Sequence, residues 1–350
     1  MKKETSHSVL YRAYRPQTFA DVQGQEPVIK ALQGSLQNKR IAHAYLFSGG
    51  RGTGKTSVAR ILARELGVTD KDLYEMDAAS NRGIDDIREI REGVYAVPFE
   101  SPYKFYIIDE AHMLTKEAWN ALLKTLEEPP AHCIFVLATT EREKVPDTIQ
   151  SRCEIYSFAN PTREMLSKVV TNVANAEGYA LEKSASELVA LLAEGSFRDS
   201  LSILQKVLAV SQEKKISIAQ VEEVSGAPRG ELVRDIIAGI ALKDAAKALS
   251  AVQKSIADNV DARTLTRLLI HRVRAILLLR FAPDLAESVG HALSEADMNL
   301  AQSLVKESGI SSDTLRKLLE AHSIMTYAAV PHVPLELAIM DICDAVKKKL

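Results

Sequence analysis

A glycine-rich segment near the start of the chain has the residue types and the spacing for binding a nucleoside triphosphate. It reads Gly49-Gly50-Arg51-Gly52-Thr53-Gly54-Lys55-Thr56-Ser57 and matches the pattern G-x-x-x-x-G-K-[ST] in full. Glycines allow such a loop to wrap phosphates with its backbone N–H groups, in conformations that a Cβ would forbid. We therefore expect these residues to bind the nucleotide, with Lys55 on the β- and γ-phosphates and the Thr56 hydroxyl on Mg²⁺.

A pair of acids follows the apolar run Phe105-Tyr106-Ile107-Ile108, which is typical of a buried strand. The strand would deliver both acids to its carboxyl end, beside the phosphates. There Asp109 would hold Mg²⁺, and Glu110 would orient and polarise the attacking water. The alternative is that the two acids only cap a helix that begins near Thr115.

Two hydroxyls end another predicted strand, in the run Leu137-Ala138-Thr139-Thr140. We expect Thr140 to sense the γ-phosphate, with Thr139 as the alternative. Threonine is also common in strands for its β-propensity alone. The paired acids, and the lack of a guanine-reading Asn-Lys-x-Asp motif after the loop, favour an AAA+ or related ATPase over a GTPase.

The elements that must position these residues alternate between short apolar strands and helices, from Tyr45 to about Phe158. The predicted strands are 45–47, 105–108, 133–138 and 154–158, and the helix after the glycine-rich loop is predicted over 56–66. This alternation predicts an α/β domain whose parallel sheet is covered by helices on both faces.

Asn160-Pro161-Thr162 ends that alternation, and every later segment reads as helix. The predicted helices are 165–177, 184–194, 199–210, 231–241, 244–257, 262–281, 294–307 and 311–328. A second break at Gly226-Ala227-Pro228 divides them. The sequence thus predicts three domains, an α/β domain over 1–159 and two all-helical domains over 160–226 and 227–350.

Several short motifs between Tyr11 and Leu204 carry a resemblance to a known family. They are Tyr11-Arg12 with Tyr14-Arg15-Pro16, then Phe19, Val22, Gly24 and Gln25, Asp77-Ala78-Ala79-Ser80-Asn81, the run 121–130, Ser151-Arg152-Cys153, and Gly195-Ser196-Phe197-Arg198-Asp199-Ser200-Leu201. Together they resemble the clamp-loader gamma/tau family of bacterial DNA polymerase III. After Gly226 the resemblance rests on helical character and length alone.

The resemblance implies roles for two arginines and for an adenine pocket. Arg152 would act in trans on ATP held by a neighbouring subunit, where a guanidinium stabilises transition-state charge. Arg198 would touch the γ-phosphate from a helical lid domain. The residues that would line the adenine pocket are Tyr11, Arg15, Pro16 and Val22.

A DNA contact is also implied, at Asn81 and Arg82. These residues precede a predicted helix that starts near Asp85, and backbone N–H groups with an arginine would contact phosphates without reading sequence. The alternative is an ordinary surface helix capped by Ser80 or Asn81.

The chain departs from the family in three respects. The family carries a four-cysteine zinc module after the phosphate-loop helix, whereas here 66–74 runs directly to the next strand without a cysteine, so no structural zinc is expected. Leu204-Gln205-Lys206 stands where the family has Leu-Asp-Gln. The chain stops where the helical collar domain should end, so it resembles the short gamma form rather than the extended tau form.

The function implied is an ATP-hydrolysing subunit that loads a sliding clamp onto primed DNA, with ATP and Mg²⁺ as cofactors. Its expected partners are the delta and delta-prime subunits, further gamma/tau copies, the clamp and the DNA, in a hetero-oligomer with no polymerase site in this chain. One alternative is another AAA+ DNA enzyme of the branch-migration or replication-restart type. A second alternative is a non-catalytic structural subunit resembling delta-prime.

Composition sets few limits. The net charge is −2 with 46% apolar and 26% charged residues, which is ordinary for a globular protein, so any DNA contact must rest on local patches. The 3 cysteines have no short spacing, which favours free thiols in a reducing compartment. The polar start, 1–7, and the lack of a long apolar segment predict a soluble cytoplasmic protein with no membrane contact.

Overall fold

The computed structural model describes residues 9–211, 213–285, 293, 295–307 and 309–344. These residues form two compact units, Met1–Leu166 with Ala193–Ser202, and Ser167–Leu192 with Ile203–Leu350. The polar start that we noted in the sequence lies outside the described residues. The division into three domains stays a prediction.

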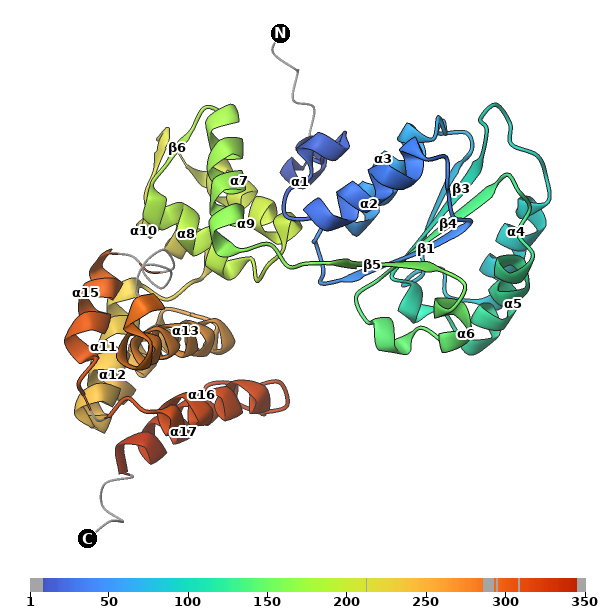
Figure 1. The fold of residues 1–350 in the computed structure, drawn as a ribbon. Coiled ribbons are helices and arrows are strands. Elements are labelled where there is room, and N and C mark those ends of the chain that lie inside the picture. Colours follow the sequence, from blue (N-terminus) through green and yellow to red (C-terminus); the bar gives the residue numbers. More distant parts are fainter. Residues whose placement is uncertain (1–8, 212, 286–292, 294, 308, 345–350) are drawn as a thin grey trace. The chain divides into compact units, whose positions relative to one another are not determined.

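The first unit contains a five-stranded sheet in the order β2-β3-β4-β1-β5, with every neighbouring pair parallel (Figure 1). The strands are β1 (Ala44–Gly49), β2 (Leu73–Asp77), β3 (Lys104–Asp109), β4 (Cys133–Thr139) and β5 (Glu154–Phe158). The helices are α1 (Leu10–Ala13), α2 (Glu26–Gln37), α3 (Lys55–Glu65), α4 (Ile84–Val94), α5 (Lys116–Glu127) and α6 (Asp147–Gln150), with short 3₁₀ turns η1 (Phe19–Asp21), η2 (Ala111–Met113) and η3 (Arg142–Lys144).

Successive residues of the central strands face opposite sides of this sheet. Tyr45 and Phe47 of β1 pack with residues of α2 and α3, whereas Leu46 packs with residues of α4 and α5. Parallel strands must be apolar on both faces because helices cover both faces. The near-continuous apolar runs that predicted these strands are therefore explained by two separate core clusters, and the predicted α/β fold is confirmed.

The second unit is almost entirely helical. Its elements, two of which begin in the first unit, are α7 (Arg163–Ala176), α8 (Lys183–Leu192), α9 (Phe197–Val210), α10 (Ile218–Ser225), α11 (Gly230–Leu242), α12 (Ala245–Ala257), α13 (Ala262–Phe281), η4 (Pro283–Leu285), α15 (Glu295–Leu304), α16 (Ser312–Ile324) and α17 (Val333–Asp344). A single apolar cluster, built on Ile236, Ile240, Leu269, Leu318 and Ile339, joins α11, α13, α16 and α17. Within the described ranges no helix is long and apolar enough to cross a membrane.

One sequence expectation about this unit is wrong. Two short strands, β6 (Ala180–Leu181) and β7 (Lys215–Ile216), pair in parallel, although every segment after Asn160 had been expected to be helical. Strands of two residues carry no readable periodicity, and only tertiary pairing creates them.

Asp72 fixes the segment that connects α3 to β2. Its carboxylate is fully buried and accepts backbone hydrogen bonds from Phe99 (2.6 Å), Glu100 (2.9 Å) and Ser101 (2.8 Å). Burial alone raises the pKa of Asp72, but the hydrogen bonds outweigh it and bring the pKa down to about 2. The carboxylate of Asp72 thus holds the short segment between α3 and β2 against the loop that precedes β3.

Asp72→Asn is expected to destabilise the first unit by about 2 kcal/mol at neutral pH, because an amide nitrogen cannot accept and leaves a buried N–H without its acceptor. A carboxyl with a lowered folded pKa stabilises above its unfolded pKa, and that stability is lost as the pH falls through the folded pKa. The difference in the free energy of unfolding between the wild type and Asp72→Asn should therefore disappear as the pH falls from 3.8 to about 2.

Urea unfolding followed by the fluorescence of Trp119 measures this difference, because Trp119 is the only tryptophan and is buried in the core of the first unit. The control is Asp70→Asn, an exposed carboxylate in the same segment, which should change stability by no more than about 0.5 kcal/mol. Equal effects of the two substitutions would contradict the assignment.

Candidate functional site

The loop between β1 and α3 adopts a backbone that requires glycine. Gly49 (φ 152°), Gly52 (φ 69°) and Gly54 (φ 103°) all have positive φ, where a side chain is strained. Lys55 begins α3, and its Nζ donates to the carbonyl oxygens of Gly49 and Gly50, both at 2.8 Å. The ammonium is thereby held inside the loop, where a phosphate chain would bind.

Two other segments, the end of β5 and the start of α9, crowd this loop. A Cβ added at Gly49 would lie 2.4 Å from the carbonyl oxygen of Phe158, and one at Gly50 would lie 2.3 Å from Oδ1 of Asn160. A Cβ at Gly52 would lie 2.0 Å from Oγ of Ser196. The Gly52 carbonyl also accepts from the N–H of Phe197 at 3.0 Å, so the first turn of α9 is bonded directly to the loop.

The residues predicted to hold Mg²⁺ are adjacent. Thr56 Oγ1 donates to Oδ2 of Asp109 at 2.6 Å, which places the hydroxyl and the carboxylate at one point beside the loop. Hydroxyl and carboxylate oxygens are suitable magnesium ligands, and a glycine cradle with a lysine suits a triphosphate. The two residues therefore fit the ion. Burial lowers the pKa of Lys55, and the charges of Glu110 and Asp109 oppose that shift.

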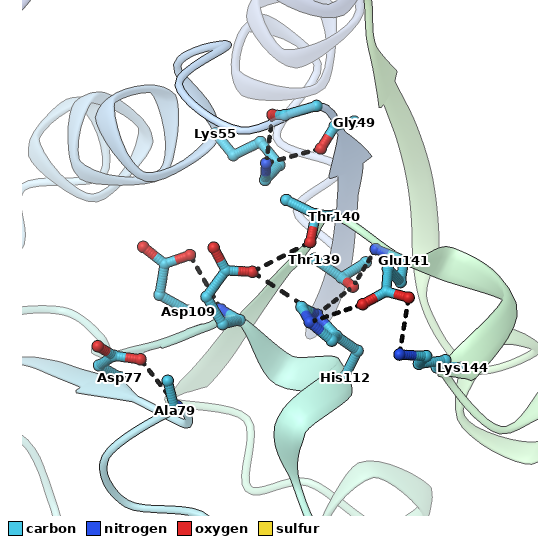
Figure 2. A network of polar contacts seen from close by, with 12 residues as sticks. Gly49, Lys55, Asp77, Ala79, Asp109, His112, Thr139, Thr140, Glu141 and Lys144 are labelled. Atoms are coloured by element: carbon cyan, nitrogen blue, oxygen red, sulfur yellow. Dashed lines mark hydrogen bonds and ion pairs between the residues drawn. The ribbon is translucent and has the colours of Figure 1, made fainter. Parts of the chain in front are cut away.

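Glu110 has an unusual backbone at the end of β3. Its φ of 49° and ψ of 41° are left-handed, a conformation that costs a residue with a side chain about 1–3 kcal/mol and occurs often at functional sites. Its Oε2 accepts from Oγ1 of Thr140 at 3.3 Å, and its N–H donates to Asp109 Oδ1 at 3.0 Å. Thr140 therefore contacts the proposed catalytic carboxylate, whereas the alternative, Thr139, is fully buried and contacts His112 (Figure 2).

The helix-cap alternative for the two acids is wrong. The N-cap of α5 is Thr115, whose side chain accepts from the N–H of Ala118 at 3.2 Å. Asp109 and Glu110 instead face the loop through the contacts above.

The N-terminal segment reaches the same site. Arg198 at the start of α9 lies over the ring of Tyr11, 4.9 Å from its centroid. Burial raises the pKa of Tyr11, but its hydrogen bonds and the charges of Arg198 and Arg12 outweigh burial and lower the pKa below its usual value. Arg15 Nε donates to Oγ of Ser57 at 2.9 Å, just after the loop.

The remaining members of the expected adenine pocket are Pro16 and Val22. Pro16 follows Arg15 in the chain, and Val22 packs against the core cluster that contains Phe19. The structure thus places Tyr11, Arg15 and Arg198 near the phosphate loop, and the pocket itself stays a prediction.

Arg152 has its hydrogen bonds elsewhere. Its Nη2 bonds to Oε1 of Glu127 at 2.6 Å, and its Nη1 donates to the carbonyl of Thr148 at 2.6 Å and to Ser151 Oγ. About a third of the side chain is exposed. The arginine therefore lies at the junction of α5 and α6, bonded to surface groups and not to the phosphate loop.

Arg82 is exposed, and its backbone carbonyl accepts from the N–H of Thr115 at 3.2 Å. The alternative for this segment, a helix capped by Ser80 or Asn81, is wrong in its capping residue. The N-cap of α4 is Gly83, whose N–H donates to the carboxylate of Asp86 at 3.0 Å, while Asn81 bonds back to the carbonyl of Asp77. Glycine is an acceptable N-cap, although a hydroxyl or amide cap is more common.

Gln25 has a role that sequence reasoning missed, although the residue was quoted in the family resemblance. Its buried amide donates to the carbonyls of Ala159 (2.8 Å) and Thr53 (3.4 Å) and accepts from the N–H of Ala159 (3.1 Å). One side chain therefore joins the phosphate loop to the end of β5. A buried amide with this many partners is a positioning residue, and its polar neighbours Gln23 and Glu26 leave no local signal in the sequence that would have indicated it.

No group of three or more His, Cys, Asp or Glu side chains that could hold a metal ion occurs in the part of the chain that the structure describes. That finding does not test the expected lack of zinc, which stays a prediction.

Gly52→Ala is expected to weaken ATP binding by about tenfold or more. Alanine at positive φ costs roughly 1–2 kcal/mol, and its Cβ would displace the Ser196 hydroxyl and with it the start of α9. Titration calorimetry with a slowly hydrolysed ATP analogue measures the affinity. The control is Gly34→Ala in α2, where a Cβ meets open space. It should keep the affinity and stabilise by up to about 1 kcal/mol. Unchanged affinity in Gly52→Ala would show that the loop does not need this conformation.

Solved structures with a similar fold include the Thermotoga maritima RuvB Holliday junction branch migration motor. It is 20% identical, has a TM-score of 0.52, and the alignment covers 91% of this chain and 94% of that one. At this identity the similarity establishes the fold alone.

Sequence comparisons give the family. A profile described as DNA polymerase III, delta subunit, matches residues 24–79 and 68–162, and one described as DNA polymerase III clamp loader subunit, ATPase lid domain, matches 166–213. DNA polymerase III subunit tau of Bacillus subtilis is 36% identical over 97% of this chain and 64% of its own length. Subunit gamma/tau of Mycobacterium tuberculosis is 39% identical over 79% of this chain and 52% of its own length.

Subunit tau of Escherichia coli is 37% identical over 79% of this chain and 46% of its own length. The chain thus spans between about half and two thirds of the length of these relatives. The two family profiles match consecutive segments of the chain, and these relatives are named as tau or gamma/tau subunits of DNA polymerase III. Both findings agree with the motifs in the site. The chain therefore belongs to the clamp-loader gamma/tau family of bacterial DNA polymerase III.

Proposed function

We propose that this chain is an ATP-hydrolysing subunit of a clamp loader, which places a sliding clamp on primed DNA during replication. The observation that carries the proposal is the assembly of one nucleotide site from Lys55, Thr56, Asp109 and Glu110, with Arg198 at its edge. A non-catalytic subunit resembling delta-prime does not require that set. RuvB is similar only in fold, so the branch-migration alternative has no site residue in its favour.

The residues of the site have distinct tasks. Lys55 and the backbone N–H groups of the loop bind the phosphates, and Glu110 orients the attacking water while Thr140 fixes its carboxylate. Thr56 and Asp109 would hold Mg²⁺, which when bound neutralises charge on the β- and γ-phosphates. Arg198 connects the nucleotide to α9, so lid position follows nucleotide state.

Arg152 requires a neighbouring subunit. Its side chain bonds to Glu127 and Thr148 rather than to the phosphate loop of its own chain, and about a third of it is exposed. A guanidinium that reaches a neighbour's γ-phosphate makes hydrolysis depend on assembly. The proposed assembly contains delta, delta-prime and further gamma/tau copies, and it acts with the clamp and primed DNA in the cytoplasm.

Arg152→Ala is expected to leave ATP affinity unchanged and to lower the turnover of the assembled complex by roughly 10³-fold, the scale of an arginine finger. The matched control is Arg60→Ala, because Arg60 is as exposed as Arg152 and also pairs with a glutamate, Glu75, at 2.6 Å. Steady-state ATPase assays on the reconstituted complex compare the two variants. Normal hydrolysis by the Arg152 variant would show that Arg152 is no trans finger.

Arg82→Ala is expected to weaken stimulation of the ATPase by primed DNA and to reduce the dependence of DNA binding on log salt by about one, because one phosphate contact is lost. ATP affinity and basal turnover should not change. Arg88→Ala is the control, in the helix that follows Arg82, where the guanidinium is paired with Asp85 at 2.8 Å and should contribute less. Identical salt slopes for wild type and Arg82→Ala would remove Arg82 from the DNA surface.

A further inference from the structure

His112 in η2 is almost completely buried beside the proposed catalytic carboxylate, with its side chain 7% exposed. Its Nδ1 lies 3.0 Å from Oγ1 of Thr139 and 3.6 Å from Oε2 of Glu110, and its Nε2 lies 3.3 Å from Oε1 of Glu141. Figure 2 shows the imidazole between Thr139 and Glu141. The ring therefore lies between the glutamate at the end of β3 and the segment that follows β4.

The outer end of this chain of contacts is anchored. Glu141 pairs with Lys144 at 2.7 Å, and its N–H donates to Oγ1 of Thr139 at 3.0 Å. The next residue, Arg142, exchanges hydrogen bonds with the side chain of Gln150 at the end of α6. The carboxylate that faces Nε2 is consequently fixed by its pair with Lys144, and the backbone of Glu141 is fixed by its bond to Thr139 and by the turn around it.

The inner end of this chain of contacts is Glu110, whose orientation depends most on its neighbours. Glu110 has a left-handed backbone, which points its side chain in a direction that its neighbours in β3 do not share. Its Oε2 accepts from the hydroxyl of Thr140 at 3.3 Å, and Nδ1 of His112 lies 3.6 Å from the same oxygen. A carboxylate with two polar neighbours at one oxygen loses rotamers that would take it away from the attacking water.

We propose that His112 is a positioning residue for ATP hydrolysis, which holds the carboxylate of Glu110 in its working orientation and is itself held by Thr139 and Glu141. The role deepens the proposed function and rests on it, because it assigns no contact with the nucleotide to His112. Thr139 acquires a function here that differs from sensing: it fixes the imidazole, whereas Thr140 contacts Glu110 directly.

The first test is His112→Ala in the reconstituted complex with clamp and primed DNA. We expect kcat to fall roughly tenfold to a hundredfold, the range seen when a group that orients a functional residue is removed, and KM for ATP to stay within about twofold. The matched control is His132→Ala, another part-buried histidine of the first unit, whose Nε2 lies 3.0 Å from the Val94 carbonyl. That control should leave kcat unchanged even where it lowers stability.

Conservative variants separate positioning from packing. In His112→Asn the amide can occupy the place of Nδ1 and keep the contacts with Thr139 and Glu110, so a large part of kcat should return. Glu141→Gln should lower kcat by a smaller factor than His112→Ala, because the imidazole keeps Thr139. If His112→Ala does not fold, as judged by Trp119 fluorescence, His112→Asn with Glu141→Gln decides the question.

A double-substitution cycle gives the sharpest result. If His112 acts only through Glu110, adding His112→Ala to Glu110→Gln should lower kcat by no more than about twofold beyond Glu110→Gln alone. A further tenfold loss, a raised KM with normal kcat, or an effect equal to that of His132→Ala would overturn the proposal. Failure of the proposed function looks different: Glu110→Gln itself would then leave ATPase activity intact.

Discussion

The phosphate loop has no space for side chains at three of its glycines, because other parts of the first unit already occupy that space. The end of β5 lies against Gly49, Asn160 against Gly50, and Ser196 against Gly52. The loop conformation is therefore determined by tertiary contacts as much as by the glycines themselves. A movement of the loop must move the end of β5 and the start of α9 together, since neither can be displaced alone without opening a gap in a close-packed interior.

The polar groups around the loop are satisfied by the same arrangement. Gln25 uses both ends of its amide to join the loop to Ala159, and Phe197 donates to the carbonyl of Gly52. This rigid frame makes the left-handed backbone of Glu110 tolerable, because strain at one residue persists only where its surroundings leave no relaxed alternative. The site thus combines many satisfied groups with one strained residue, and the strained residue is the one assigned to water activation.

The sequence predicted β1, β3, β4, β5 and most helices because each leaves a local pattern. Apolar runs such as Phe105 to Ile108 and the spacing from Gly49 to Thr56 depend only on neighbours in the chain. The cap at Gly83 is also local, through Asp86, but glycine is a less common cap than serine or asparagine. The pairing of β6 with β7 and the role of Gln25 depend on residues far apart in sequence. His112 was missed for the same reason: its partners Thr139 and Glu141 lie on another strand and its loop, and a lone histidine after two acids has no distinctive spacing.

The ion pair between Arg152 and Glu127 has a thermodynamic consequence for assembly. The guanidinium is already partly withdrawn from water and bonded to an anion at 2.6 Å. If the guanidinium moved to a phosphate, it would exchange one anionic partner for another. The net change in free energy would then be only the difference between two ion pairs of similar strength. Such an exchange is nearly neutral by itself, and small additional contacts from a clamp or a duplex can then decide its direction. If Arg152 acts as the proposed finger, a near-neutral exchange of this kind makes its choice of partner depend on its surroundings.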